Sequence, residues 1–179
     1  MFDPGRSVEQ TEQVFESCVL GVDPGLSALG LAAVRRRGRK SELLYLGTVR
    51  TPSGMAEAAR LRLLHEAVVG AIAEHRPDSV AIERIAWNTN QVSAMGVARA
   101  TGVVLLAAAE AGLSVEEYGS LEVKMAVSGQ GNADKAQVRD ALERFHGFGG
   151  LPNERDAVDA VAIALCHLTQ SRLRVAADT

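Results

Sequence analysis

Four carboxylates occupy positions where an isolated acidic side chain would be costly. Asp23 and Glu83 each end a short apolar run of the sequence. Asp156 and Asp159 lie three residues apart at the start of an apolar stretch with helical periodicity. Carboxylates that converge at strand ends and on the inner face of a helix repel one another unless a cation lies between them. Hard divalent cations prefer such oxygen ligands, and a pair of them commonly hydrolyses phosphodiesters, so the four acids predict a two-metal phosphodiesterase site.

Each acid also has a purely structural interpretation. Asp23 precedes a Pro-Gly pair and could simply begin a turn, while Glu83 could be an ordinary charge at a strand end. Asp156 could favour a helix N-terminus through its interaction with the helix dipole. Asp159 is harder to explain in this way because apolar residues flank it on both sides. Their joint occurrence favours the metal site.

The elements that must position these acids follow from hydrophobic periodicity and from Gly and Pro breaks. The predicted strands are Val19–Asp23, Ala28–Arg35, Leu43–Arg50, Ser79–Glu83 and Ser114–Tyr118, and the predicted helices are Met55–His75, Asn90–Ala111, Leu121–Val127, Asp134–Phe145 and Arg155–Arg174. The first three strands should be antiparallel, and the fourth, reached through a helix, should be parallel to the first. By fold-level analogy, this order predicts an α/β ribonuclease-H-like fold with a five-stranded mixed sheet flanked by helices.

The chain has 179 residues, of which 47% are apolar, and we expect one domain at residues 18–174. Residues 1–17 read as a flexible N-terminal extension without the pattern of a signal peptide, and residues 175–179 as a tail. No apolar run is long enough for a membrane span. Cys18 and Cys166 lie in apolar runs, which indicates buried thiols in a reducing compartment, and we expect a cytoplasmic protein.

The charge balance neither requires nor excludes a nucleic-acid partner. The net charge of −3 argues weakly against one, but a nuclease needs only a local basic face. The densest basic run, residues 35–40, is either a solvated hairpin turn or a DNA contact.

The motifs that surround these acids resemble those of the RuvC-type Holliday junction resolvases. The similarity covers roughly residues 19–168. It is carried in order by Leu20-Gly-Val-Asp-Pro-Gly25, by Ala81-Ile-Glu83, by a lysine-bearing segment with Val123-Lys124 and Gly129–Val138, and by Asp156-Ala-Val-Asp159-Ala-Val-Ala-Ile-Ala164. Any one of these motifs is weak, but four in order at the family's spacing are specific.

The resemblance implies a homodimeric endonuclease that cuts two opposed strands of a four-way DNA junction symmetrically. It implies the four acids as ligands of two Mg²⁺ ions, with Mn²⁺ as an alternative, and products with 5′-phosphate and 3′-hydroxyl ends. It also implies the branch-migration motor of RuvA and RuvB as a partner.

Two lysines complete the predicted site. The resemblance implies that Lys124 and Lys135 contact DNA phosphates near the cleaved bond, with Lys135 in a catalytic role that stabilises the charged transition state. Lys135 follows a Gly-x-Gly loop whose backbone could approach a phosphate closely. The alternative is a solvated lysine at a helix start, although a cation is unfavourable there.

The loop after Glu83 departs from the family pattern. The family often has a Phe three residues after the second acid, whereas this chain has Ala86 followed by Trp87. Trp87 could stack on an unpaired base or could anchor the loop in the protein. We also expect DNA contacts from Arg84 and Asn90, which lie on either side of it.

The long helix predicted at residues 90–111 is a candidate dimer interface, and the alternative is that it packs within the core of its own chain. A symmetric dimer would match the two cuts that a symmetric junction requires.

Three other functions remain open. A YqgF-type ribonuclease has a similar first strand, but the lysine segment and the paired late Asp residues favour the resolvase. An ATPase of the actin type needs two such domains, and this chain has room for one. A junction-binding protein without activity would not need four intact acids.

Overall fold

The computed structural model of the protein describes residues 16–85 and 91–177, without the side chains of residues 91–93 and 172–177. The elements, in chain order, are β1 (Glu16–Asp23), β2 (Ala28–Arg37), β3 (Lys40–Arg50), α1 (Glu57–His75), β4 (Ser79–Glu83), α2 (Gln91–Glu110), β5 (Ser114–Tyr118), α3 (Ser120–Ser128), α4 (Lys135–Arg144) and α5 (Arg155–Ala177). Every element predicted from the sequence is present, with ends that differ by a few residues.

The ends of the folded domain differ from the prediction. Strand β1 begins at Glu16, inside the segment 1–17 that was predicted as an extension, because Glu16 pairs with Arg37 of the neighbouring strand. Helix α5 continues to Ala177, inside the predicted tail 175–179.

The five strands form one mixed sheet in the order β3-β2-β1-β4-β5, which confirms the predicted fold class. Strand β1 is antiparallel to β2 and parallel to β4, and β4 is parallel to β5. In this register Asp23 lies opposite Gly30, and Val22 lies opposite Ile82. Since Val22 and Ile82 directly precede the two strand-end acids, β1 and β4 deliver those acids to the same edge of the sheet.

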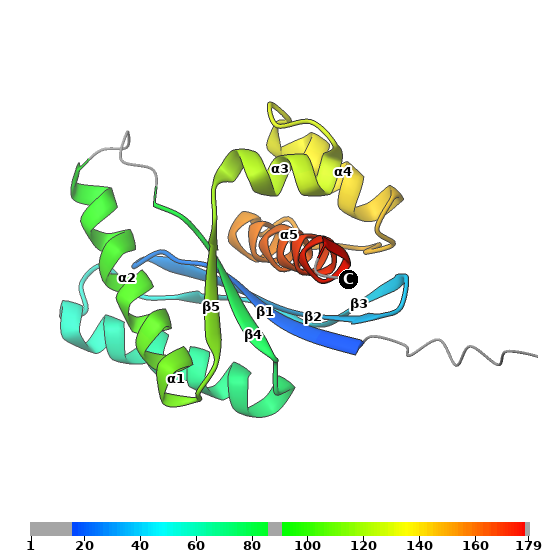
Figure 1. Cartoon of the computed structure of the whole chain (residues 1–179). Coiled ribbons are helices and arrows are strands. Elements are labelled where there is room, and N and C mark those ends of the chain that lie inside the picture. The colour runs from blue at the N-terminus through cyan, green and yellow to red at the C-terminus, as the bar shows by residue number, and fades with distance from the viewer. Residues whose placement is uncertain (1–15, 86–90, 178–179) are drawn as a thin grey trace, which may run out of the picture.

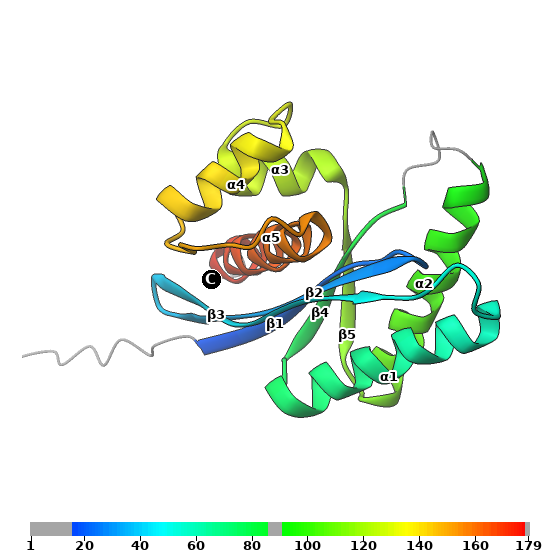
Figure 2. The ribbon, with the colours of Figure 1, turned by 180° about the vertical axis from the view of Figure 1, so that it is seen from behind.

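Helices cover both faces of the sheet (Figures 1 and 2). Helix α5 lies on one face with α3 and α4 beyond it, and α1 and α2 cover the other face. The alternation of β1 explains the two layers, because successive strand side chains point to opposite faces. Val19 belongs to the core under α5, whereas Leu20 and Val22 belong to the core under α1 and α2.

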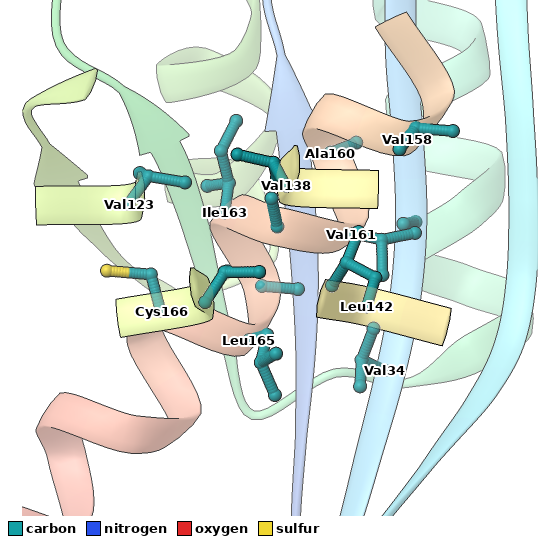
Figure 3. Packing of buried hydrophobic residues seen from close by; sticks show 14 of the residues in the cluster. Val34, Val123, Val138, Leu142, Val158, Ala160, Val161, Ile163, Leu165 and Cys166 are labelled. Atoms are coloured by element: carbon teal, nitrogen blue, oxygen red, sulfur yellow. The ribbon is translucent and has the colours of Figure 1, made fainter. Parts of the chain in front are cut away.

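Small residues allow α5 to lie very close to the sheet. Figure 3 shows Ala160, Val161 and Leu165 of α5 in the core between the sheet and α4. A Cβ atom at Gly21 would lie 2.1 Å from the carbonyl oxygen of Ala160. A Cβ atom at Gly30 would lie 1.9 Å from the carbonyl oxygen of Asp156, so glycine is required wherever α5 crosses β1 and β2.

A buried histidine fixes the middle of α5. The ring nitrogens of His167 lie 3.0 Å from Ser79 Oγ and 2.8 Å from the Tyr118 hydroxyl. A neutral imidazole can donate from one nitrogen and accept at the other, so one ring can bind both partners. These bonds hold α5 against β4 and β5.

The structure also bears on the two cysteines, on a membrane-spanning helix and on the basic run 35–40. Both cysteines are free and buried. Within the described ranges, no helix is long and apolar enough to cross a membrane. The basic run 35–40 comprises the end of β2, the two-residue turn and the first residue of β3, at the end of the sheet away from Asp23.

Candidate active site

The four predicted acids come together at one edge of the sheet. Asp23 is the last residue of β1 and Glu83 is the last residue of the parallel neighbour β4. Asp156 and Asp159 occupy the first turns of α5, which begins over β2 beside Gly30, the partner of Asp23. We call these four side chains the acid cluster.

The members of the acid cluster are close enough to affect the ionisation of Asp23. The pKa of Asp23 is raised from 3.8 to about 7, mainly by burial and then by the negative charges of Asp159, Glu83 and Asp156, in that order of size. Lys135 acts in the opposite direction. A carboxyl group whose pKa is raised by burial and by nearby like charges is typical of a functional site.

Glu83 accepts a hydrogen bond from a side chain at the start of α3. Burial raises the pKa of Glu83, whereas a hydrogen bond from the Ser120 side chain lowers it. Asp159 raises this pKa, and the charges of Lys135 and Lys124 lower it, so the structure brings both predicted lysines within electrostatic reach of Glu83. Ser120 is not among the site residues predicted from the sequence. Its position two residues after the last residue of β5, the parallel neighbour of β4, was the available signal.

Lys135 forms an ion pair with the acid cluster. Its Nζ lies 2.5 Å from Asp159 Oδ2. Burial lowers the pKa of Lys135, but the hydrogen bond and charge of Asp159, with smaller effects of Asp23 and Asp156, more than compensate and the pKa is raised. Lys135 is the first residue of α4, after the N-cap Asp134. The carboxylates therefore explain a cation at a helix start, where the dipole disfavours it.

The acid cluster fits a divalent metal by its chemistry. As the side chains lie, no three acidic, histidine or cysteine groups within the described ranges converge closely enough to hold a metal ion, and Asp159 is engaged by Lys135. The donor set consists of carboxylate oxygens, which suit hard cations such as Mg²⁺. Four carboxylates beside one paired lysine leave the cluster with net negative charge, which a bound cation would compensate, and repulsion from the other three acids contributes to the raised pKa of Asp23.

The structure gives less support to the other predicted DNA contacts, which are Arg84, Trp87 and Asn90. The guanidinium of Arg84 donates to the carbonyl oxygen of Glu117 at 3.0 Å and lies 4.0 Å from the Glu122 carboxylate. Arg84 therefore lies beside the acid cluster but is engaged by its own chain. Trp87 and Asn90 lie outside the described residues.

The metal-free protein should lose stability as the pH rises from about 4 to 7. In this range folded Asp23 retains a proton that the unfolded chain has released, so the folded state binds more protons and stability falls with pH. The expected loss is roughly 3 kcal/mol in the free energy of unfolding. Urea denaturation in EDTA at several pH values measures it, and Asp23→Asn should flatten the profile. An unchanged slope in that variant would show that Asp23 is not the titrating group.

The sequence matches the family model described as "Crossover junction endodeoxyribonuclease RuvC" over residues 19–167. A protein of that name from Rubrobacter xylanophilus is 40% identical over 167 residues, which covers 93% of this chain and 91% of the relative. The T. thermophilus RuvC solved in complex with Holliday junction substrate superposes with a TM-score of 0.83 at 35% identity, covering 88% of this chain and 96% of the other.

A more distant structure supports the fold alone. The yeast mitochondrial Holliday junction resolvase Ydc2 superposes with a TM-score of 0.67 at 12% identity, over 88% of this chain and 80% of the other. The match to the RuvC family model and the similarity to the RuvC relatives support the DNA endonuclease and give no support to the RNA-directed alternative.

Proposed function

Because this chain belongs to the RuvC family of crossover junction endodeoxyribonucleases, we propose that it resolves four-way DNA junctions in recombination and repair. The observation that carries the proposal is the convergence of two strand-end acids, two α5 acids and Lys135 at one sheet edge. The T. thermophilus relative was solved with a Holliday junction substrate, which supports the same substrate here.

We propose that Asp23, Glu83, Asp156 and Asp159 hold the metal. Members of the family depend on a divalent metal, and we infer two Mg²⁺ ions, with Mn²⁺ as an alternative. When bound, such ions activate a water and neutralise charge on the leaving oxygen, which would leave 5′-phosphate and 3′-hydroxyl ends. The acids contribute fixed oxygen ligands from two strand ends and one helix.

The basic residues around the acid cluster would position the DNA. We propose that Lys135 and Lys124 contact phosphates near the cleaved bond and that Lys135 stabilises the charge of the transition state. Their effects on the pKa of Glu83 support this placement. Arg84, Trp87 and Asn90 are proposed as further DNA contacts beside Glu83.

We propose a homodimer that cuts two opposed strands symmetrically. Helix α2 buries Val104 and Ala108 but exposes Met95 and Leu106, so one face is left for a partner subunit. The motor of RuvA and RuvB would supply the junction. We place the protein in the cytoplasm, where its DNA substrate and its two free thiols fit.

The direct test compares substrates. With Mg²⁺, the purified protein should convert a synthetic four-way junction into nicked duplexes and should leave a linear duplex of the same sequence intact. A single-stranded RNA of the same sequence should also remain uncut. Preferential cleavage of the RNA would support the ribonuclease alternative, and cleavage of no substrate would overturn the proposal.

A further inference from the structure

A groove opens beside the ion pair of Lys135 with Asp159, between α4 and the start of α5. We call it the α4–α5 groove, and its lining residues are Lys135, Ala136, Arg139, Asn153, Arg155, Val158 and Asp159. Three of these side chains are cations, one is an amide, and one is a carboxylate. Such a lining suits a ligand with anionic oxygens.

Arg139 lines this groove and connects its two sides. Its guanidinium donates to the carbonyl oxygens of Leu151 and, at 2.8 Å, of Pro152. It also lies 3.3 Å from Asn153 Oδ1 and 3.3 Å from Glu143 Oε1. Arg139 therefore ties α4 to the segment that leads into α5. The oxygen of Asn153 accepts from Arg139, and its amide nitrogen forms no hydrogen bond with the described residues, so this nitrogen can donate to a ligand.

Among the three cations of the groove, Arg155 is the one that is not engaged by the described part of the chain. It is the exposed first residue of α5, and it forms no hydrogen bond or ion pair with any residue that the structure describes. The positive end of the α5 dipole lies at the same place, which further favours an anion. A guanidinium can bind two oxygens of one phosphate at once.

We propose that the α4–α5 groove binds the DNA phosphate next to the one that is cut, with Arg155 as its main ligand and Asn153 as a second donor. This inference rests on the proposed function. Asp159 belongs to both the acid cluster and the groove, so a strand whose scissile phosphate lies at the acids continues into the groove. A fixed neighbouring phosphate would set which bond reaches the acids.

The first test is Arg155→Gln in the full-length chain. Because Arg155 is exposed and forms no hydrogen bond or ion pair with the residues that the structure describes, the variant should fold normally. Its dissociation constant for a four-way junction, measured by fluorescence anisotropy in EDTA, should rise about 5- to 20-fold, and the slope of log affinity against log salt should fall by about one. Arg155→Lys should restore the slope but only part of the affinity.

The matched control is Arg62→Gln. Arg62 is an exposed arginine of α1, on the other face of the sheet, and it lies 3.8 Å from Glu66. Its loss should leave junction affinity and salt slope unchanged. Equal effects of Arg62→Gln and Arg155→Gln would indicate only a general loss of positive charge and would overturn the assignment.

A second test locates the contacted phosphate. Junctions with one neutral methylphosphonate at successive positions should bind the wild type more weakly when the modification lies next to the cut site. Arg155→Gln should lose nothing more there, because the contact is already absent. If the variant binds like the wild type, or if the two losses simply add at that position, the groove is not the phosphate site. Failure of the wild type to cut any junction would instead overturn the proposed function.

Discussion

Replacing Asp23 by asparagine should abolish junction cleavage while the fold and junction binding persist. Asparagine is nearly isosteric with aspartate, but its neutral amide is a poor ligand for a hard divalent cation. Asp23 is the member of the acid cluster that is coupled to all the others, so its loss should reduce the cleavage rate by at least about a thousand-fold. Binding should be retained or become slightly tighter, because one negative charge near the DNA phosphates is removed.

Single-turnover cleavage with Mg²⁺ and anisotropy without metal separate these two effects. Asp140→Asn is the matched control, since Asp140 is a half-exposed acid of α4 whose carboxylate lies 2.6 Å from Arg144. That variant should cut within about two-fold of the wild type, as expected of a surface substitution. Cleavage by Asp23→Asn within about ten-fold of the wild type would contradict the assignment of the acid cluster.

Replacing Gly30 by alanine should damage both stability and activity. The new Cβ would lie 1.9 Å from the carbonyl oxygen and 2.3 Å from the carbonyl carbon of Asp156, and these backbone atoms cannot rotate away. The first turn of α5 must therefore move, at a cost of about 2 to 4 kcal/mol in the free energy of unfolding. Because Asp156 and Asp159 move with it, cleavage should fall by about a hundred-fold.

Urea denaturation and cleavage assays of Gly30→Ala test this expectation. The matched control is Gly70→Ala in α1, where a Cβ would meet nothing within 4 Å. Alanine is a better helix former than glycine, so the control should gain up to about 1 kcal/mol and retain activity. A Gly30→Ala protein as stable and active as the wild type would show that α5 can lie further from the sheet without loss.

The acid cluster could be predicted from the sequence because each acid lies at the end or in the first turns of an element whose apolar pattern is clear. Asp23 and Glu83 end strands, and Asp156 and Asp159 lie in the first turns of the apolar helix, so the fold order alone brings them to one edge. The bond from Ser120 to Glu83 could not be predicted in this way. It depends on the turn geometry after β5, which hydrophobic periodicity does not report.

The positions of close packing at glycines are a second feature that could not be predicted from the sequence. Because glycine is costly within a helix, Gly96 and Gly102 of α2 are positions where close packing is expected. A Cβ at Gly96 would meet only Leu26, at 3.4 Å, and one at Gly102 would meet nothing within 4 Å. The tight approaches to α5 are instead at Gly21 and Gly30, in strands, because these positions depend on where α5 crosses the sheet.

The parallel pairing of β1 with β4 sets where the chain can change in length. Asp23 and Glu83 meet because the register is fixed from Val19 opposite Ser79 onward, and strand side chains alternate between faces. One inserted residue within β1 would turn Asp23 to the opposite face of the sheet. The segment between α4 and α5 has no such alternation, so insertions there are tolerated as long as Arg139 can still reach it. Length variation among related chains should therefore concentrate in the loops and spare β1 and β4.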